Sequence, residues 1–156
     1  MASLRDELVQ PQRRLPDLAL TSASGAGYRL QGGGRRSPVL VLVHAGPCAA
    51  CDGYVHRLGA AAAALGEWDG EVLVISPAGA GEPLPDASFP LLHDSEDRVA
   101  AALGVRPPAV VIADQWGEVH DVREAGDEHR FPAEAEIESW LRYLAIQCPE
   151  CQGEAL

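Results

Sequence analysis

The sequence predicts an α/β fold, in which a central mixed β-sheet is flanked by helices. Three short, mainly apolar runs, at 39–43, 71–75 and 109–113, are typical of strands buried on both faces. Segments with apolar residues at helical spacing lie between these runs. This strand–helix–strand alternation favours a parallel core with right-handed crossovers. A length of 156 residues suits a single domain.

The chain before the first apolar run is expected to form a lead-in and a hairpin. Residues 1–14 are polar and show no apolar periodicity. Between residues 15 and 30, apolar and polar residues alternate on either side of Ser24-Gly25-Ala26-Gly27, a segment typical of turns. Residues 31–38 contain three consecutive glycines and are expected to form a loop.

Two helices are predicted in the middle of the chain. The first covers 48–65, and its apolar face consists of Cys51, Val55, Leu58, Ala62 and Leu65, spaced by three or four residues. Gly66 is a typical helix end. A short strand is expected at 89–92, and the second helix follows it, capped by Asp94 or Ser95 and ending at Gly104.

The C-terminal part is expected to add an antiparallel edge and a last helix. After the third apolar run, Asp114-Gln115-Trp116-Gly117 predicts a turn into a strand over 118–122. The last helix is predicted over 132–147, with proline at its start. Its apolar face consists of Ile137, Trp140, Leu141, Leu144, Ala145 and Cys148. We therefore expect a domain over 15–147 and a short tail over 148–156.

Composition excludes some classes of partner. The net charge is −11, from 12 basic and 23 acidic residues. Nucleic acids and anionic membranes both favour a positive surface, so neither is expected as a partner. The sequence has no apolar run long enough to span a bilayer and no N-terminal apolar segment typical of a signal peptide. We therefore expect a cytoplasmic protein.

Four cysteines form two Cys-x-x-Cys pairs, Cys48/Cys51 and Cys148/Cys151. Without a secretion signal, this pattern indicates redox chemistry or metal binding rather than a disulfide framework. The first pair stands where a buried strand gives way to a helix, whose positive end stabilises a thiolate, although Asp52 opposes it at short range. Cys48 lies at the cap and Cys51 on the apolar face. We therefore expect Cys48 to be the attacking nucleophile and Cys51 the sheltered resolving thiol.

Four motifs carry a resemblance to a known family. The strand end at His44 followed by Cys48-Ala49-Ala50-Cys51 resembles the thioredoxin superfamily's aromatic-rich strand end and Cys-Gly-Pro-Cys. Gly104-Val105-Arg106-Pro107-Pro108 resembles its Gly-Val-x-x-Pro segment. Leu15-Pro16-Asp17-Leu18 and Asp114-Gln115-Trp116-Gly117 resemble the opening and the hairpin of the redoxin branch, which includes alkyl hydroperoxide reductase and thiol-specific antioxidant relatives.

The resemblance implies a thioredoxin-like domain that acts as a thiol–disulfide oxidoreductase without an organic cofactor. Pro108 corresponds to the family's cis-proline, which faces the cysteine pair and shapes the substrate groove. His44 takes the place of the family's first tryptophan, a packing role, with proton transfer as the alternative. The implied partners are a disulfide-bearing protein or small thiol as substrate, and a reductase or another thiol as electron donor.

Departures from the family narrow the chemistry. Peroxiredoxins carry a threonine and an arginine near the reactive cysteine that this sequence lacks at the matching positions, which disfavours the alternative of a thiol-dependent peroxidase. Thioredoxins carry a buried aspartate six residues before the first cysteine, where this sequence has Leu42. Glu71, Asp94 and His44 are the candidates to take over its role in proton transfer.

The second cysteine pair leaves several alternatives open. A last helix rising 1.5 Å per residue carries Cys148 about 22 Å from the first pair, which disfavours a four-cysteine zinc site within one chain. Three alternatives remain for this pair: Cys148 packs at the end of the apolar face and Cys151 lies in a short tail, the two form a second redox pair, or they are zinc ligands shared between subunits. A non-enzymatic metal-binding or adaptor role is therefore an alternative to catalysis. His56, His120 and His129 match no motif and are expected at the surface.

Overall fold

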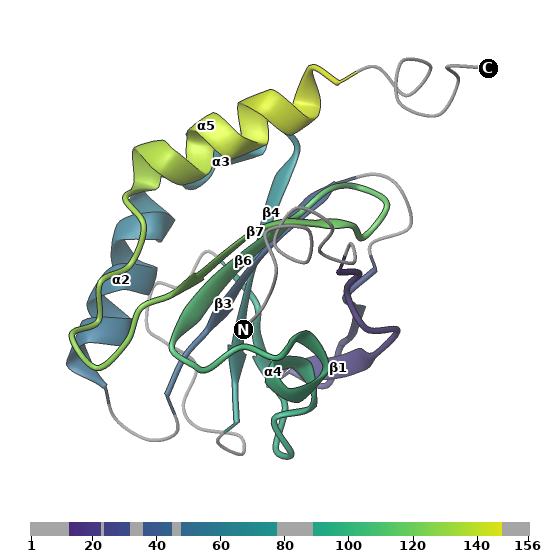
Figure 1. Cartoon of the computed structure of the whole chain (residues 1–156), viewed down its shortest axis with the longest axis vertical. Helices are drawn as coiled ribbons and strands as arrows, with labels where there is room; N and C mark the ends of the chain where they lie inside the picture. The colour runs from purple at the N-terminus through teal and green to yellow at the C-terminus, as the bar shows by residue number, and fades with distance from the viewer. Residues whose placement is uncertain (1–12, 23, 32–35, 45–47, 78–88, 148–156) are drawn as a thin grey trace, which may run out of the picture.

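A mixed β-sheet forms the centre of the structure, with helices on both faces (Figure 1). The computed structural model describes residues 13–22, 24–31, 36–44, 48–77 and 89–147. Within these residues the sheet has seven strands in the order β2-β1-β5-β4-β3-β6-β7. The strands are β1 (Ala19–Ser22), β2 (Gly27–Arg29), β3 (Ser37–Leu42), β4 (Gly70–Ser76), β5 (Leu91–His93), β6 (Ala109–Ala113) and β7 (Val119–Glu124). The helices are α2 (Ala49–Ala60), α3 (Ala62–Glu67), α4 (Arg98–Leu103) and α5 (Glu134–Ala145). The predicted α/β class and mixed sheet are confirmed.

Strand direction places the end of β3 beside the start of β6. β3 runs parallel to β4, and β4 runs parallel to β5. The sequence alternation predicts a parallel core, but β6 runs antiparallel to β3, with Leu42 opposite Ala109. The segment between β5 and β6 contains the six-residue helix α4, which is about 9 Å long. β6 begins at the edge where β5 ends because it pairs antiparallel with β3, a contact between distant segments that strand–helix alternation does not encode.

Side chains of the central strands alternate between two apolar cores, one on each face of the sheet. One core packs against α2, α3 and α5, and its strand residues are Val39, Val41, Val72, Val74, Val110 and Ile112. The other packs against α4 and the N-terminal hairpin, and its strand residues are Leu40, Leu42, Leu73, Ile75, Leu92, Ala109, Val111 and Ala113. Burial on both faces explains why these strands read as unbroken apolar runs.

The predicted helix over 48–65 is wrong in one respect, because the chain forms two helices there. The first ends at Ala61, whose backbone amide donates to the carbonyls of both Arg57 and Leu58. Consecutive alanines favour a helix, but they have no large side chains that could pack against the core and keep the two segments on one helix axis. The break lets α3 turn behind α5, as Figure 1 shows. Leu65 is then buried in the core on that face.

Two helix starts differ from the predictions. α4 begins at Arg98 rather than after Asp94, and the Asp94 carboxylate accepts hydrogen bonds from the amides of Arg98 and Val99, at 3.0 and 2.8 Å. Asp94 therefore accepts hydrogen bonds from the first amides of α4, although it lies in the turn before the helix. α5 begins at Glu134 rather than at Pro132, because the carbonyl of Pro132 accepts a hydrogen bond from another part of the chain. On the predicted face of α5, Ile137, Leu141 and Leu144 are buried, Trp140 is half-buried and Ala145 is exposed.

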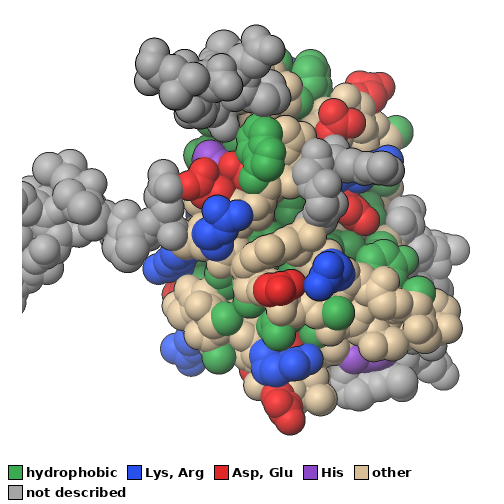
Figure 2. Space-filling view, turned by 90° about the vertical axis from the view of Figure 1, so that its right-hand side faces the viewer, with side chains coloured by type: hydrophobic (Ala, Val, Ile, Leu, Met, Phe, Trp, Pro, Cys, Tyr) green, Lys and Arg blue, Asp and Glu red, His purple; other side chains and the backbone are tan. Residues whose placement is uncertain are grey.

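The N-terminal hairpin is confirmed, with β1 paired antiparallel to β2 and Gly25 in its turn at φ +88°. The end of the expected lead-in also joins the sheet, because Arg14 forms a β-bridge with Glu118. No helix in the described part of the chain has the length and apolar character needed to cross a bilayer. Figure 2 shows the side of the molecule that lies to the right in Figure 1, where basic, acidic and apolar side chains are interspersed.

Candidate active site

Cys48 caps the N-terminus of α2 with its sulfur. Its backbone is extended, with φ −145° and ψ 102°, and its Sγ accepts a hydrogen bond from the amide of Cys51 at 3.3 Å. Serine or threonine oxygen usually makes this contact at a helix N-cap. The thiol is half-buried, and both described cysteines are free thiols. The sulfur therefore lies where the helix dipole and an N–H donor both favour a negative charge.

Cys51 is the sheltered member of the pair. Its side chain is 2% exposed and belongs to the buried face of α2. The pKa of the Cys51 thiol is raised from 9.0 to about 12, mainly by burial; a hydrogen bond from the backbone of His44 opposes this change, and nearby Cys48 and Asp52 add to it. The two cysteines therefore differ in exposure in the way that the sequence predicts, one accessible and one kept protonated by its surroundings.

Pro108 lies at the same edge of the sheet as the cysteine pair. The bond between Pro107 and Pro108 is cis, as the resemblance implies, and Pro108 is buried. Its neighbour Ala109 pairs with Leu42, which lies two residues before His44. The antiparallel register of β3 and β6 therefore brings the proline, the strand end and the start of α2 to one place.

His129 contacts Cys48, which sequence reasoning missed. Its Nε2 lies 3.5 Å from Cys48 Sγ, and its Nδ1 lies 3.0 Å from the carbonyl oxygen of Asp127. His129 was expected at the surface; it is half-buried, and its contact with Cys48 was not predicted. No local pattern in the sequence points to this contact, which follows from strand direction: β6 starts at the cysteine edge, so the antiparallel β7 ends there. The loop from β7 to α5 then passes beside the start of α2 (Figure 1).

An aromatic stack fixes the loop that carries His129. The rings of Phe131 and Tyr54 are stacked, with centroids 4.2 Å apart and planes 9° apart. The buried Tyr54 hydroxyl donates to the carbonyl of Pro132 at 2.8 Å. His129 itself has a φ of +55°, a left-handed conformation that is uncommon for residues other than glycine. Backbone hydrogen bonds of the loop hold this conformation: the His129 amide donates to the carbonyl of Gly126 at 3.1 Å, and the Arg130 amide donates to the carbonyl of Ala125 at 3.0 Å.

His44 is the one candidate among the proposed proton-transfer residues that lies beside Cys48. Its ring centroid is 4.9 Å from that of His129, with an angle of 59° between the planes. Glu71 pairs with Pro38 at the opposite end of β3. Asp94 already accepts the first amides of α4.

The remaining predicted residues lie elsewhere. Cys148 and Cys151 fall outside the described residues. His56 is exposed on α2, as expected. His120 was expected at the surface but is partly buried, and its Nε2 lies 2.9 Å from a carboxylate oxygen of Asp114. Within the described part of the chain, the site therefore consists of His44, Cys48, Cys51, Pro108 and His129.

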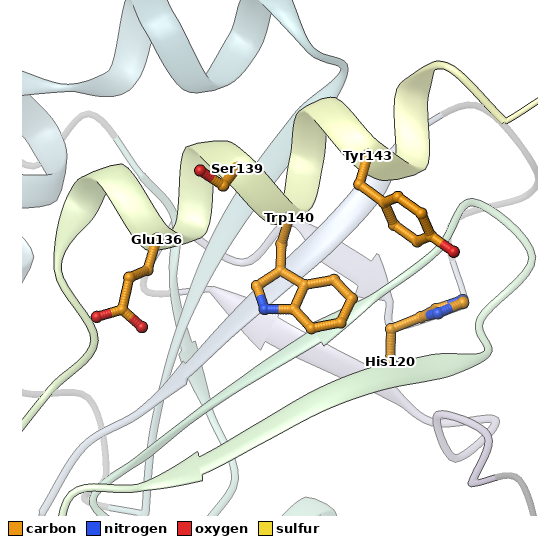
Figure 3. Close-up of a pocket in the computed structure, with 5 residues that line it drawn as sticks. All are labelled: His120, Glu136, Ser139, Trp140 and Tyr143. Carbon is orange, nitrogen blue, oxygen red and sulfur yellow. The ribbon is translucent and has the colours of Figure 1, made fainter.

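A separate pocket lies between β7 and α5 (Figure 3). Its volume is about 480 Å³, and its lining residues are His120, Glu136, Ser139, Trp140 and Tyr143. Trp140, expected in the core, is half-buried: it packs against the core on this face and also lines the pocket. The pocket contains no cysteine among its lining residues and shares no residue with the site at Cys48.

Comparison with solved structures identifies the fold. No protein-family model matches the sequence, and no curated protein matches it. The structure of peroxidoxin BcpB from Mycobacterium tuberculosis is similar at a TM-score of 0.72 and 21% identity, over 88% of this chain and 97% of that one. The pneumococcal exposed lipoprotein thioredoxin Etrx1 from Streptococcus pneumoniae is similar at a TM-score of 0.68 and 21% identity, over 83% and 100% of the two chains.

A third similar structure is a putative thiol:disulfide interchange protein DsbE from Chlorobium tepidum, with a TM-score of 0.67 and 17% identity, over 87% of this chain and 97% of that one. These proteins share one arrangement of strands and helices with this chain along nearly their whole lengths. The sequence-based prediction of a thioredoxin-like fold is confirmed: this chain has the thioredoxin fold.

Proposed function

We propose that this chain is a thiol–disulfide oxidoreductase, with Cys48 as the nucleophile and Cys51 as the resolving thiol. One observation carries the proposal. A half-buried thiol at the start of a helix lies within hydrogen-bonding distance of an amide and an imidazole, one helical turn from a second, buried thiol. This is the arrangement that thiol–disulfide exchange needs, because only the attacking sulfur must reach the substrate.

The reaction transfers two electrons from the cysteine pair to the substrate. The Cys48 thiolate attacks one sulfur of a substrate disulfide, forms a mixed disulfide and releases the other sulfur as a thiolate. Cys51 then loses its proton and attacks Cys48. The mixed disulfide breaks, the second substrate thiol leaves, and the Cys48–Cys51 disulfide remains. The raised pKa of Cys51 keeps it protonated while Cys48 makes the first attack.

His129 is suited to take the proton of the Cys48 thiol. The carbonyl oxygen of Asp127 can only accept a hydrogen bond, so the contact at 3.0 Å places a proton on His129 Nδ1. In the neutral ring, Nε2 is then the acceptor, and it faces Cys48 Sγ at 3.5 Å. A cysteine beside an imidazole whose second nitrogen is held by another group is a recurrent arrangement for activating a nucleophile.

The proposal includes the partners and the compartment. The substrate is a disulfide-bearing protein or a small thiol compound, and Pro108 shapes the groove that receives it. A reductase or another thiol restores the dithiol form, and the cytoplasm is the proposed compartment. No organic cofactor takes part, because sulfur atoms carry both electrons throughout the exchange.

Reduction of insulin disulfides tests the proposal. We expect Cys48→Ser to abolish the activity and Cys51→Ser to accumulate a mixed disulfide with the substrate. His129→Ala is expected to lower the rate by about 10²-fold, the smaller end of the effect of positioned proton acceptors. His56→Ala is the matched control, since His56 is exposed on α2, and its activity should equal that of the wild type. Full activity in Cys48→Ser would overturn the proposal.

A thiol-dependent peroxidase is the second candidate, since the similar structure with a TM-score of 0.72 is named a peroxidoxin. In that reaction, the Cys48 thiolate attacks hydrogen peroxide, forms a sulfenic acid and releases hydroxide. Cys51 then condenses with the sulfenic acid, which yields the disulfide and water. Peroxide consumption in the presence of excess reductant distinguishes the two functions, because an oxidoreductase without peroxidase activity consumes peroxide no faster than an ordinary free thiol does.

A further inference from the structure

We propose that His44, Cys48 and His129 together bind a zinc ion when the cysteine pair is reduced. The three side chains come from the end of β3, the cap of α2 and the loop between β7 and α5. Their candidate ligand atoms, two imidazole nitrogens and one sulfur, all lie within 4.8 Å of one another. The inference goes beyond the proposed function, because it requires only that Cys48 is a free thiol.

One edge of the site already has the spacing of a zinc centre. Zn–S bonds of about 2.3 Å and Zn–N bonds of about 2.0–2.1 Å in tetrahedral geometry place a ligand sulfur and a ligand nitrogen about 3.5–3.6 Å apart. The Cys48 Sγ and His129 Nε2 atoms are 3.5 Å apart. The His44 nitrogen lies within 4.8 Å of both Cys48 Sγ and the His129 nitrogen. A small change in the side-chain torsions of His44 brings it to bonding distance of the same ion.

The hydrogen bond at the second ring nitrogen of His129 is also typical of a metal-bound histidine. Histidines that bind metals nearly always donate their second ring N–H to a carbonyl, carboxylate or water, which fixes the ring and the nitrogen that faces the metal. His129 Nδ1 makes this contact with the carbonyl of Asp127 at 3.0 Å. The stack of Phe131 on Tyr54 holds the loop in place. The ring is therefore oriented before any ion arrives.

The ligand types select the metal. One thiolate and two imidazoles favour zinc over calcium or magnesium, which take oxygen ligands. Three protein ligands leave a fourth position for water, as in zinc sites that are not purely structural. A second group of ligating side chains, Asp114, Glu118 and His120, carries no such proposal. The carboxylate of Asp114 there already accepts the amides of Trp116 and Glu118 and pairs with His120.

Zinc binding and oxidation of Cys48 exclude one another. Binding replaces the thiol proton of Cys48 with the metal and releases that proton to solvent. Formation of the disulfide with Cys51 removes the sulfur ligand and expels the ion. By linkage, zinc therefore stabilises the dithiol form and prevents Cys48 from attacking a disulfide.

The experiment uses the whole chain with Cys148→Ser and Cys151→Ser, so that the second pair cannot bind metal. This background is stripped of metal, reduced with a phosphine and titrated with zinc in competition with a chromophoric chelator. Cobalt(II) provides a spectroscopic readout of thiolate ligation. We expect one ion per chain and a thiolate-to-cobalt absorption that Cys48→Ser abolishes.

Histidine variants decide the ligand set. His44→Ala and His129→Ala should each lower zinc affinity by at least the 10–100-fold that follows loss of an outer-shell contact. His56→Ala is the matched control and should bind zinc as the background does. Circular dichroism checks that each variant is folded, and either histidine variant alone suffices for the test. Unchanged affinity in a folded His44→Ala or His129→Ala variant, or no binding by the background, overturns the proposal.

The proposal and the oxidoreductase function fail in different ways. Insulin reduction by metal-free protein tests the function alone, and zinc should suppress that activity in the background but much less in His44→Ala. Zinc binding by an inactive metal-free protein would leave the site standing and refute the function. Activity that saturating zinc does not change would refute the site and leave the function standing.

Discussion

Burial of Cys51 leads to a quantitative prediction about its reactivity. Its pKa is raised from 9.0 to about 12, mainly because the thiol is buried. At a pH below both pKa values, each unit of difference in pKa changes the thiolate fraction tenfold. At pH 8, the thiolate fraction of Cys51 is therefore about a thousandfold lower than that of a thiol with the ordinary pKa. In a Cys48→Ser variant without the tail cysteines, the smaller contribution of Cys48 is lost. We therefore expect Cys51 to be alkylated at least about 100-fold more slowly than an ordinary exposed thiol.

The pH dependence of alkylation separates this effect from steric shielding. Shielding lowers the rate equally at every pH, whereas a raised pKa moves the point at which the rate stops increasing. We expect the rate constant with iodoacetamide to rise about tenfold per pH unit up to pH 11, without levelling off near pH 9. The same variant unfolded in guanidinium chloride should level off near the ordinary value. A plateau near pH 9 in the folded protein would refute the assignment of a raised pKa.

Three further predictions concern stability, measured as the free energy of urea unfolding. Tyr54→Phe leaves the buried carbonyl of Pro132 without its hydrogen bond and should destabilise the fold by about 1–3 kcal/mol, and an unchanged midpoint would contradict the contact. The folded state keeps the Cys51 proton to higher pH than the unfolded chain does, so the stability that it contributes is complete below pH 9 and is lost as the pH rises towards 12. Each titrating group contributes a slope of about 1.4 kcal/mol per pH unit there, and Cys51→Ala should reduce the slope. Gly70→Ala would place a methyl group against the side chain of Leu141 and 2.9 Å from a backbone oxygen, so we expect the free energy of unfolding to fall by about 1–3 kcal/mol. Gly66→Ala is the control, because open space surrounds that position and the substitution should not lower the stability.

Local pattern was enough to predict much of the fold. The three apolar runs appear as β3, β4 and β6 because strands buried on both faces need apolar side chains at every position. The spacing of Cys51 relative to Val55 and Leu58 predicts that it is buried, and the position of Cys48 before the helix predicts its cap role. Both residues lie as expected, since helical periodicity decides which side chains share a face.

The errors arise where contacts far apart in the sequence decide the outcome. The start of α5 depends on the hydrogen bond between Tyr54 and Pro132, which are 78 residues apart. The break at Ala61 depends on how α3 packs under α5. Helix propensity predicts neither feature. An alanine run favours a helix whether or not tertiary packing requires a break in it.

Spacing along single segments is enough to predict the three central strands and the difference in exposure between Cys48 and Cys51. Only the tertiary structure decided which histidine meets the thiol. His129 lies 81 residues from Cys48 and reaches it because β6 pairs antiparallel with β3 and β7 pairs antiparallel with β6, which brings the end of β7 to the cysteine edge. Strand direction is set by the pairing of distant strands, and no local pattern encodes it.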